Sequence, residues 1–377
     1  MGVPDRVTGE GMSVGSSRYR RPTKQDSVDL HVDGTFDAIG RKHELVFGLM
    51  HSRLNEDRYT AGAVTAGPPS GSFFEWDGSY PEPAWTPLVQ NYDDKIRQYA
   101  AYGAVRLSLA DPVKLIAGFR YSKWKNNNSG TIRVHEKFTP YVGAIVDITK
   151  QLSVYASYTS IFDPQDYRDR NGRYLDPIVG KNYEAGIKGE FLDGRLNASL
   201  AVFQTEQDNV AEQDGTHLVP GTTEFAYIGV KGVKAKGFEA EISGEIAEGW
   251  QLSAGFARAA PKQPDGTIFA SNVPRNKLNL FTSYRFGGAL EGLTLGGGGR
   301  WVSSAYRNIW TPAGTVQYTE GDYAIVDLMA RYEFRKGMSV QINADNILNK
   351  KYYQHLGYYG GVFGLTRNVT ARLAVAF

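Results

Sequence analysis

The sequence contains no cysteine, and this absence removes three classes of site at once. None of its 377 residues can form a disulfide, a thiolate ligand for zinc or a cysteine nucleophile. The sequence also has no large excess of one charge, since it contains 42 lysine and arginine residues and 40 aspartate and glutamate residues. Because there is no large basic excess, the composition gives no reason to expect a nucleic acid as a partner.

Long apolar runs are absent as well. No stretch approaches about 18 consecutive apolar residues, so the sequence predicts no transmembrane helix. The polar start from Met1 to Arg6 has no apolar stretch of the kind that marks a signal peptide. A barrel that crosses the bilayer with strands leaves the same absence, because each strand is apolar on only one face.

Signatures of catalysis and of bound cofactors are also missing. The sequence holds no G-x-x-x-x-G-K-[S/T] loop that would cradle phosphates, and its six histidines show no metal-ligand spacing. His135 and Glu136 begin a zinc-protease motif that lacks its second histidine. We therefore expect no catalytic residue, no metal site and no cofactor, although an Asp/His pair joined across loops would leave no trace in the spacing.

Glycine and aromatic residues are what the sequence has in abundance. It contains 43 glycines, and phenylalanine, tryptophan and tyrosine make up 12% of the chain. These residues suit strands and turns better than helices. At the end of the chain, Val369, Leu373 and Val375 alternate with Asn368 and Arg372. The alternation predicts a strand that turns the three apolar residues to lipid and Arg372 to a lumen.

The same alternation recurs along the chain and predicts an all-β protein. It marks about 15 segments, whose ends are set to within about 2–4 residues. The segments are 25–38, 43–56, 93–109, 113–125, 134–147, 151–162, 181–191, 195–209, 233–246, 249–260, 274–286, 292–306, 321–334, 338–346 and 364–377.

The links between these segments alternate between short and long. Tight links such as 39–42 and 335–337 alternate with long ones such as 57–92, 210–232 and 347–363. Outer-membrane barrels show this asymmetry, with short periplasmic turns and long extracellular loops. A soluble propeller or solenoid would have similar links at both ends and an internal repeat, and the sequence shows no repeat. The pattern therefore predicts a transmembrane antiparallel β-barrel.

Four stretches resemble a known family. They are Asn182 to Glu190 with Asp193 to Asn197, then Val273 to Lys277, Asn346 to Tyr353, and the terminal Phe377. The first is similar to a mid-barrel hairpin of the family, the third to a signature before the last strand, and Phe377 to an outer-membrane assembly signal. Together they resemble TonB-dependent outer-membrane siderophore receptors of the ferric hydroxamate, coprogen and pyoverdine type.

The resemblance covers the C-terminal barrel portion of such a receptor. Complete members begin with a signal peptide and an energy-coupling box, followed by a plug domain and a barrel of about 22 strands. The resemblance implies that about 15 of these strands are present and that the plug domain is absent. Residues 25–377 would then be a partial barrel and residues 1–24 the remnant of an extracellular loop.

The function that the resemblance implies is that of a receptor and transporter for a ferric siderophore in the cell outer membrane. Its partners would be the siderophore, outer-membrane lipid and lipopolysaccharide, and the TonB–ExbB–ExbD system acting through the absent plug and coupling box. The chain alone is expected not to be competent for transport. The alternatives are a passive porin-like channel and, less favoured, a barrel enzyme, so that no enzymatic activity is expected.

Aromatic residues in the long loops are the candidates for binding the siderophore. Aromatic walls suit a bulky organic iron chelate, whereas the competing interpretation is that such residues belong to an interface belt or a loop core. Tyr358 and Tyr359 are the strongest pair, because the resemblance implies a ligand-facing aromatic residue near the last strand. The full set of candidates is Trp76, Tyr80, Trp85, Trp310, Tyr358 and Tyr359.

Two further clusters have structural interpretations. Arg168, Asp169 and Arg170 follow Asp166 in a long loop and predict a solvated face or a contact with lipopolysaccharide. The glycine run from Gly296 to Gly299 lies inside a strand pattern with no helix after it, which indicates close strand packing or a bend.

Overall fold

The computed structural model describes residues 7–11, 16–64, 71–77, 79, 81–311, 314–357 and 360–376 of the chain. Within these residues the protein is all-β, as predicted, with two single-turn 3-10 helices in connecting segments, η1 (Phe73–Glu75) and η2 (Gly288–Leu290). None of the helices in this described part is long and apolar enough to cross a membrane.

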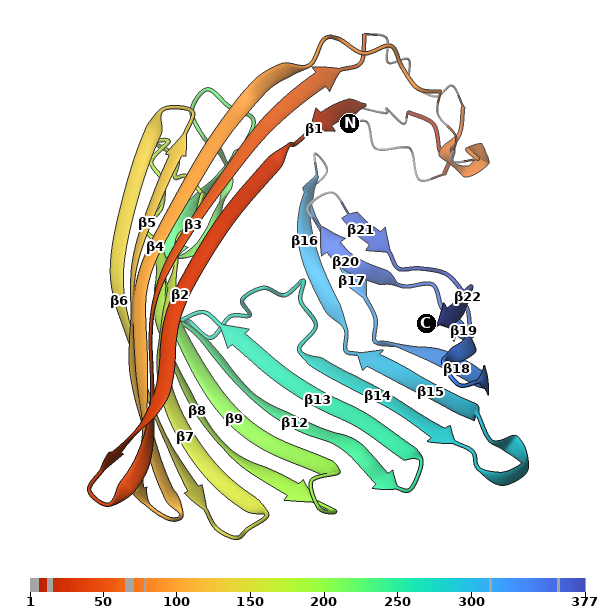
Figure 1. The fold of residues 1–377 in the computed structure, drawn as a ribbon. Helices are drawn as coiled ribbons and strands as arrows, with labels where there is room; N and C mark the ends of the chain where they lie inside the picture. Colours follow the sequence, from red (N-terminus) through yellow and green to blue (C-terminus); the bar gives the residue numbers. More distant parts are fainter. Residues whose placement is uncertain are drawn as a thin grey trace. The chain divides into compact units, whose positions relative to one another are not determined.

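Most strands belong to one sheet of 16 strands (Figure 1). Its order is β1-β3-β4-β5-β6-β7-β8-β9-β12-β13-β14-β15-β18-β19-β22, and β2 also pairs with β3. Its strands are β1 (Ser17–Arg20), β2 (Thr23–Ala38), β3 (Arg41–Gly62), β4 (Val89–Ala110), β5 (Val113–Asn128), β6 (Thr131–Asp147), β7 (Leu152–Asp163), β8 (Ile178–Phe191), β9 (Leu196–Asp208), β12 (Val233–Ala247), β13 (Trp250–Lys262), β14 (Asn276–Arg285), β15 (Leu293–Val302), β18 (Tyr323–Arg335), β19 (Met338–Asp345) and β22 (Asn368–Val375).

Each predicted segment coincides with one strand of this sheet. β3 and β4 are 22 residues long and extend well past the predicted segments 43–56 and 93–109. Pairing continues there beyond the apolar alternation, since Tyr59 to Gly62 of β3 form a ladder with β1. The last strand is shorter than predicted, because the Gly364 amide donates to the Tyr352 carbonyl at 2.9 Å and takes the chain out of the ladder.

Three further hairpins lie in links that the sequence predicted to be irregular loops. Each forms a separate sheet of two antiparallel strands. The pairs are β10 (Val210–Leu218) with β11 (Phe225–Val230), β16 (Ala305–Thr311) with β17 (Gly314–Glu320), and β20 (Tyr353–Gly357) with β21 (Gly360–Phe363). The long links of this part of the chain are therefore folded elements.

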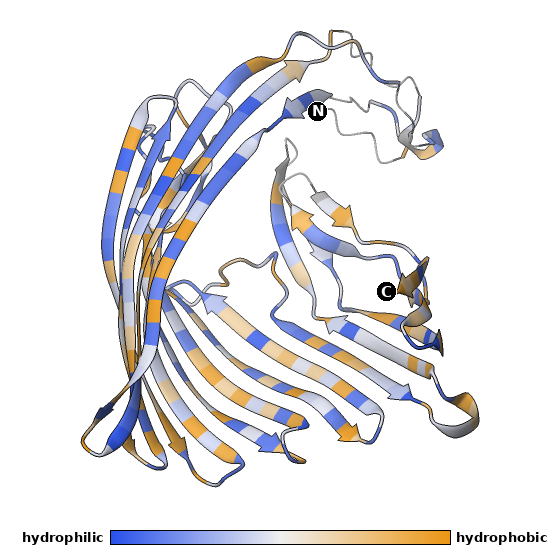
Figure 2. Cartoon of the chain, in the orientation of Figure 1, coloured by the Kyte–Doolittle hydropathy of each residue, from blue (hydrophilic) through white to orange (hydrophobic). Residues whose placement is uncertain are grey.

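The registers give the main sheet one apolar face and one polar face. Leu373 lies opposite Val340, and Val340 lies opposite Tyr332, so apolar residues meet apolar residues from strand to strand. Arg372 lies opposite Gln341 on the other face. Figure 2 shows the resulting alternation of apolar and polar residues along the strands. Because a slip of one residue would exchange the two faces, this pattern fixes the register of each strand.

Aromatic rings lie over glycines that face them on neighbouring strands. Phe203 of β9 is directly opposite Gly237 of β12, and Phe281 of β14 is directly opposite Gly298 of β15. A Cβ atom at Gly298 would lie 2.9 Å from the Phe281 ring and would also collide with the Leu280 carbonyl oxygen. The predicted close packing at the glycine run is confirmed, since a ring fills the space that a side chain would occupy.

The chain divides into two compact units. The first holds residues 1–34, 46–103 and 119–138, which include the loop-side parts of β3 and β4. The second holds residues 35–45, 104–118 and 139–377, which include β7 to β22 and the three extra hairpins. Two of the predicted aromatic residues, Trp76 and Trp85, thus belong to the first unit, and Trp310 belongs to the second.

Candidate ligand-binding site

Two of the extra hairpins of the second unit contact each other through tyrosines. The Tyr318 hydroxyl on β17 donates a hydrogen bond to the Tyr353 hydroxyl on β20, with 2.6 Å between the oxygens. The ring centroids are 5.4 Å apart. Tyr353 also stacks on Phe363 of β21, with centroids 4.5 Å apart. The hairpins β16–β17 and β20–β21 therefore form one aromatic body, which we call the hairpin pair (Figure 1).

The hairpin pair stands on a buried base. Tyr352 is only 7% exposed, and its ring lies 4.6 Å from that of Tyr323 at the start of β18. Leu356 is 3% exposed, and its carbonyl accepts a hydrogen bond from the Asn272 amide at 3.4 Å. This burial makes Tyr352 and Leu356 part of a small loop core that supports the hairpin pair.

Asn346 explains why the chain turns sharply into this base. Its side-chain amide donates to the carbonyls of Lys350 at 2.9 Å and Leu365 at 3.0 Å, and its Oδ1 accepts the Lys350 amide at 2.8 Å. Asn346 and Asn349 both have φ of 49°, a conformation that asparagine tolerates better than most residues. The stretch from Asn346 to Tyr353, singled out in the sequence, is thus the anchor of the hairpin pair.

The tyrosine contact between the hairpins is held in its neutral form. The hydrogen bond with Tyr353 and partial burial raise the pKa of Tyr318 to about 12. Two neutral hydroxyls can donate and accept in sequence, which leaves a lone pair and a proton for an outside partner. The pair can therefore offer a ligand both aromatic surface and hydrogen bonds.

Neighbouring loops join the hairpin pair through a chain of hydrogen bonds. The segment 263–275 contacts β16, since the Tyr306 amide donates to the Ser271 carbonyl at 2.9 Å. The same segment reaches β10, where the Gln263 amide donates to the Glu212 carboxylate at 2.9 Å. The β10–β11 hairpin, the 263–275 segment and the hairpin pair thus form a connected set of loops, which we call the loop rim.

Charged residues predicted to form a solvated or lipopolysaccharide-contacting face form exposed ion pairs within the loop rim. The Arg170 guanidinium forms two hydrogen bonds of 2.7 Å with Asp214 of β10, and Arg168 lies 2.9 Å from Glu224. The rings of Tyr167 and Tyr227 lie 4.3 Å apart beside them. These pairs fasten the loop that follows β7 to the β10–β11 hairpin and remain exposed, which agrees with the predicted solvated face, while contact with lipopolysaccharide stays a prediction.

The predicted ligand residues are distributed unevenly. Trp310 lies on β16 opposite Thr315, and its strand belongs to the hairpin pair. Tyr358 and Tyr359 lie outside the described residues, in the link between β20 and β21, and Tyr80 lies outside them as well. The structure therefore brings together the hairpins that carry Trp310 and the Tyr358–Tyr359 link, which are far apart in the sequence.

Trp76 and Trp85 occupy the long link between β3 and β4 in the first unit. The Trp76 indole donates to the Ser79 carbonyl at 2.6 Å, and the Trp85 indole donates to the Glu82 carboxylate at 3.0 Å. Trp85 also forms a β-bridge with Ala63. Trp76 is 38% exposed, whereas Trp85 is half-buried at the foot of the link.

Sequence reasoning did not select Tyr318 and Tyr323. Both contact tyrosines of the last long link, Tyr353 and Tyr352, whereas the sequence reasoning selected Tyr358 and Tyr359 there. A signal was present, since Tyr318 lies in a short stretch, Gly314 to Glu320, of residues suited to a strand. A pairing between two distant loops cannot be read from such a local pattern.

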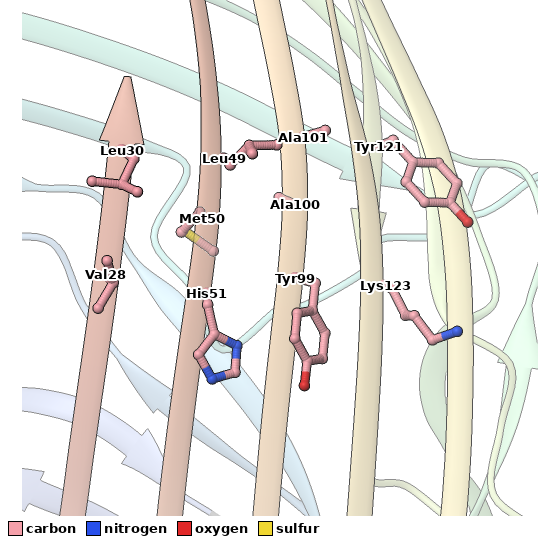
Figure 3. Close-up of a pocket in the computed structure, with 10 residues that line it drawn as sticks. All are labelled: Val28, Leu30, Leu49, Met50, His51, Tyr99, Ala100, Ala101, Tyr121 and Lys123. Atoms are coloured by element: carbon pink, nitrogen blue, oxygen red, sulfur yellow. The ribbon is translucent and has the colours of Figure 1, made fainter. Parts of the chain in front are cut away.

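A hollow of about 440 Å³ lies on β2 to β5 in the first unit (Figure 3). Figure 3 shows His51 and Tyr99 side by side, and their rings stack with centroids 4.6 Å apart. Apolar residues such as Val28 and Leu30 form much of its wall. Few polar groups converge on it, so it suits lipid chains better than a polar iron chelate.

The described residues contain no group of three or more histidine, aspartate or glutamate side chains placed to hold a metal ion. The chemistry that the rim offers is aromatic contact and hydrogen bonding.

Comparisons with known proteins agree with this picture. A family model described as TonB dependent receptor-like, beta-barrel, matches residues 4–347. The chain is 39% identical to the ferripyoverdine receptor of Pseudomonas aeruginosa, over 94% of this chain and 44% of that receptor. It is 37% identical to the ferric-pyoverdine BN7/BN8 receptor of Pseudomonas putida, over 98% of this chain and 46% of that receptor.

Solved structures give the same relationship. The crystal structure of the ferripyoverdine receptor of the outer membrane of Pseudomonas aeruginosa, bound to ferripyoverdine, superimposes with a TM-score of 0.86 and 38% identity. The match covers 95% of this chain and 49% of that chain. The chain thus spans about half the length of the relatives that it matches.

Proposed function

Because the chain belongs to the family of TonB-dependent receptor β-barrels, we propose that it is the C-terminal barrel portion of a receptor for a ferric siderophore. Members of this family lie in the outer membrane, as the sequence predicted. Pyoverdine is the chelator named for the two relatives described above, so a ferric chelate of the pyoverdine type is the proposed substrate class. Family membership favours a receptor over the porin-like channel and the barrel enzyme.

The proposed organisation assigns residues 25–377 to the barrel and residues 1–24 to an extracellular loop. The barrel would have about 22 strands, of which this chain supplies about 15. The plug and the coupling box, through which TonB–ExbB–ExbD would act, would come from parts of the receptor outside this sequence. The chain alone would accordingly not transport.

The observation that carries the proposal is the hairpin pair. It joins the strand of Trp310 to the hairpin whose link holds Tyr358 and Tyr359, and its tyrosine contact leaves aromatic surface and hydroxyl groups at the loop end of the second unit. Aromatic faces with a few polar groups suit an organic chelate. Trp310, Tyr358 and Tyr359 are therefore proposed to contact the siderophore. Trp76, Tyr80 and Trp85 stay proposed ligand-binding residues of the first unit, taken by itself.

The test uses the protein that the gene encodes, expressed in a receptor-null strain of a pyoverdine-using bacterium. We expect uptake of iron-labelled pyoverdine to appear, and Tyr358→Ala with Tyr359→Ala to weaken siderophore binding at least tenfold without loss of outer-membrane insertion. A matched pair, Tyr332→Ala with Phe334→Ala, replaces exposed aromatic residues at the opposite end of β18 and should leave binding unchanged.

Two outcomes would contradict the proposal. Equal loss of binding in both aromatic pairs would show that the residues act through folding rather than through contact. Diffusion of small solutes without any dependence on a siderophore would favour the porin-like channel.

A further inference from the structure

A group of exposed basic side chains lies on the apolar face of β8, β9, β12 and β13, at the ends that lead into the long loops. We call it the outer basic cluster, and its members are Lys181, Lys234, Lys236, Arg258 and Lys262. The strand registers place these residues opposite one another, or opposite neighbours on the same face, in rows that run across the strands. Lys234 lies opposite Lys262, Lys236 opposite Ala260, and Arg258 opposite Phe238. Basic side chains from three strands, β8, β12 and β13, therefore gather on one surface, which β9 crosses between β8 and β12.

The positive charge of this cluster is largely uncompensated. Glu206 is the acidic residue in these rows, and its Oε1 lies 2.9 Å from the Lys234 Nζ. The Arg258 guanidinium donates to a neutral partner, the side-chain amide oxygen Oδ1 of Asn276, at 3.5 Å. Glu206 also interacts electrostatically with Lys181, whereas over the described ranges Lys236 and Lys262 form no ion pair with a carboxylate. A ligand with more than one negative charge would be attracted here.

On the same face, the residues between the outer basic cluster and the tight turns are apolar. Val202 lies opposite Phe238, and Leu200 lies opposite Ala240, which faces Phe256. The Phe238 and Phe256 rings stack with centroids 5.4 Å apart. Val202 and Leu200 are 55% and 48% exposed. In an outer-membrane barrel this face meets lipid, so the cluster lies where the apolar band ends on the side of the long loops.

A hollow of about 850 Å³ joins the charged and apolar parts of this surface. Its lining includes Lys234, Lys236, Arg258 and Lys262 together with Val202 and Phe238. The hollow is thus wide enough for a sugar-phosphate group and is bounded on one side by the surface that acyl chains would cover. Lysine and arginine side chains at this depth reach toward the headgroup layer along their own apolar stems.

We propose that the outer basic cluster binds a phosphorylated glycolipid of the outer leaflet. Its phosphate groups would lie against Lys234, Lys236, Arg258 and Lys262, and its acyl chains would lie along Val202, Leu200 and Phe256. The argument combines charge complementarity with the continuity of the apolar rows. It rests on the outer-membrane location of the family and is independent of which siderophore the receptor takes up.

The test uses the protein that the gene encodes, extracted from outer membranes in a mild detergent. Native mass spectrometry measures the bound glycolipid in the wild type and in a triple variant, Lys234→Gln, Lys236→Gln and Lys262→Gln. We expect the bound fraction to fall at least tenfold. The control triple Lys42→Gln, Lys150→Gln and Lys336→Gln changes the same charge at exposed residues near the tight turns and should retain the lipid.

A second measurement identifies the chemistry that is recognised. Delipidated protein is mixed with diphosphorylated lipid A, with dephosphorylated lipid A or with inorganic phosphate, and its unfolding temperature is recorded. We expect only the phosphorylated lipid to stabilise the wild type, and more salt to weaken this effect. Equal stabilisation by the dephosphorylated lipid, equal stabilisation by phosphate alone, or full retention of glycolipid in the triple variant would each overturn the proposal.

Two controls keep the outcome interpretable. Heat-modifiable migration reports insertion of each variant, and Lys236→Gln alone repeats the assay if the triple variant does not insert. Pyoverdine binding is measured on the same proteins and is expected to be unchanged. A wild type that binds glycolipid but no siderophore would contradict the proposed receptor function and leave the lipid site standing.

Discussion

Gly237 and Gly298 show how a missing side chain sets the distance between two strands. At Gly237 a Cβ atom would collide with the Arg258 backbone carbonyl and with the Phe203 ring, and the backbone cannot move aside as a flexible side chain could. Overpacking of this kind costs about 1–3 kcal/mol. Gly237→Ala is therefore expected to lower the stability of the inserted protein by about 1–3 kcal/mol.

Gly255 on the adjoining strand provides the matched control. A Cβ atom there would have its nearest neighbour at 3.8 Å, in the Glu241 side chain. Gly255→Ala should thus leave the urea midpoint of unfolding in detergent unchanged or slightly raised, while Gly237→Ala lowers it. Equal midpoints for the two variants would show that the ring and carbonyl relax freely.

Asn346 is a second residue whose substitution should weaken the structure around it. Its side chain is almost fully buried, at 2% exposure, and makes three hydrogen bonds with Lys350 and Leu365. Leaving buried partners unsatisfied costs about 1–3 kcal/mol for each group. Asn346→Ala is expected to release the segment that carries β20 and β21, because these bonds tie both ends of that segment together.

Limited proteolysis of the inserted protein measures this release. Cleavage within residues 353–363 should accelerate at least tenfold in Asn346→Ala. Asn343→Ala is the comparison, since that side chain is half-exposed and its hydrogen bonds, with Gln341 at 2.8 Å and Thr370 at 3.5 Å, involve no residue of the 346–365 segment. Unchanged cleavage in Asn346→Ala would mean that the hairpin pair is held by its tyrosine contacts alone.

At the scale of elements, the strands of the main sheet were predictable and the loop hairpins were not. Strands such as β14 and β18 alternate apolar and polar residues because one face meets apolar surroundings. The strand β17 alternates as well, with Val316 and Tyr318 between polar residues, but this alternation is short and lies inside a long link, so the sequence did not separate the hairpin β16–β17 from a loop. Its contact with β20 depends on tertiary packing, and so Tyr318 was missed.

The tyrosine contact between β17 and β20 predicts a dependence on high pH. The pKa of Tyr318 is raised to about 12 by its hydrogen bond with Tyr353 and by burial, from a usual value of 10.0. A raised pKa means that the folded hairpins hold the proton more tightly than unfolded ones. The stabilisation is therefore complete below pH 10 and is lost between pH 10 and about 12.

Hydrogen exchange of β20 and β21 between pH 9 and pH 12, corrected for the intrinsic rate, measures this loss. Protection should fall across that window in the wild type and should be lower but nearly independent of pH in Tyr318→Phe. Tyr167→Phe removes a hydroxyl from another loop tyrosine and should behave as the wild type. Identical profiles in the wild type and in Tyr318→Phe would contradict the assignment.

At the scale of the whole molecule, the two outermost strand positions of the main sheet determine how the chain should behave when it is expressed by itself. β22 pairs with β19, and β1 and β2 pair with β3, so in the described part of the chain each outermost position has one edge without a ladder partner. An unpaired backbone group in hydrocarbon costs several kcal/mol. A sheet with two such edges is a template for association with other chains.

We therefore expect the 377-residue chain, expressed by itself from Met1, to accumulate as an aggregate. Heat-modifiable migration in outer-membrane fractions should show no folded monomer, and the same result is expected when a secretion signal is added. The protein that the gene encodes, expressed in parallel, should show the folded form because additional strands would cover both edges. Siderophore-dependent growth of a receptor-null strain with this chain alone would refute the prediction, since the edges would then have to be satisfied within the chain itself.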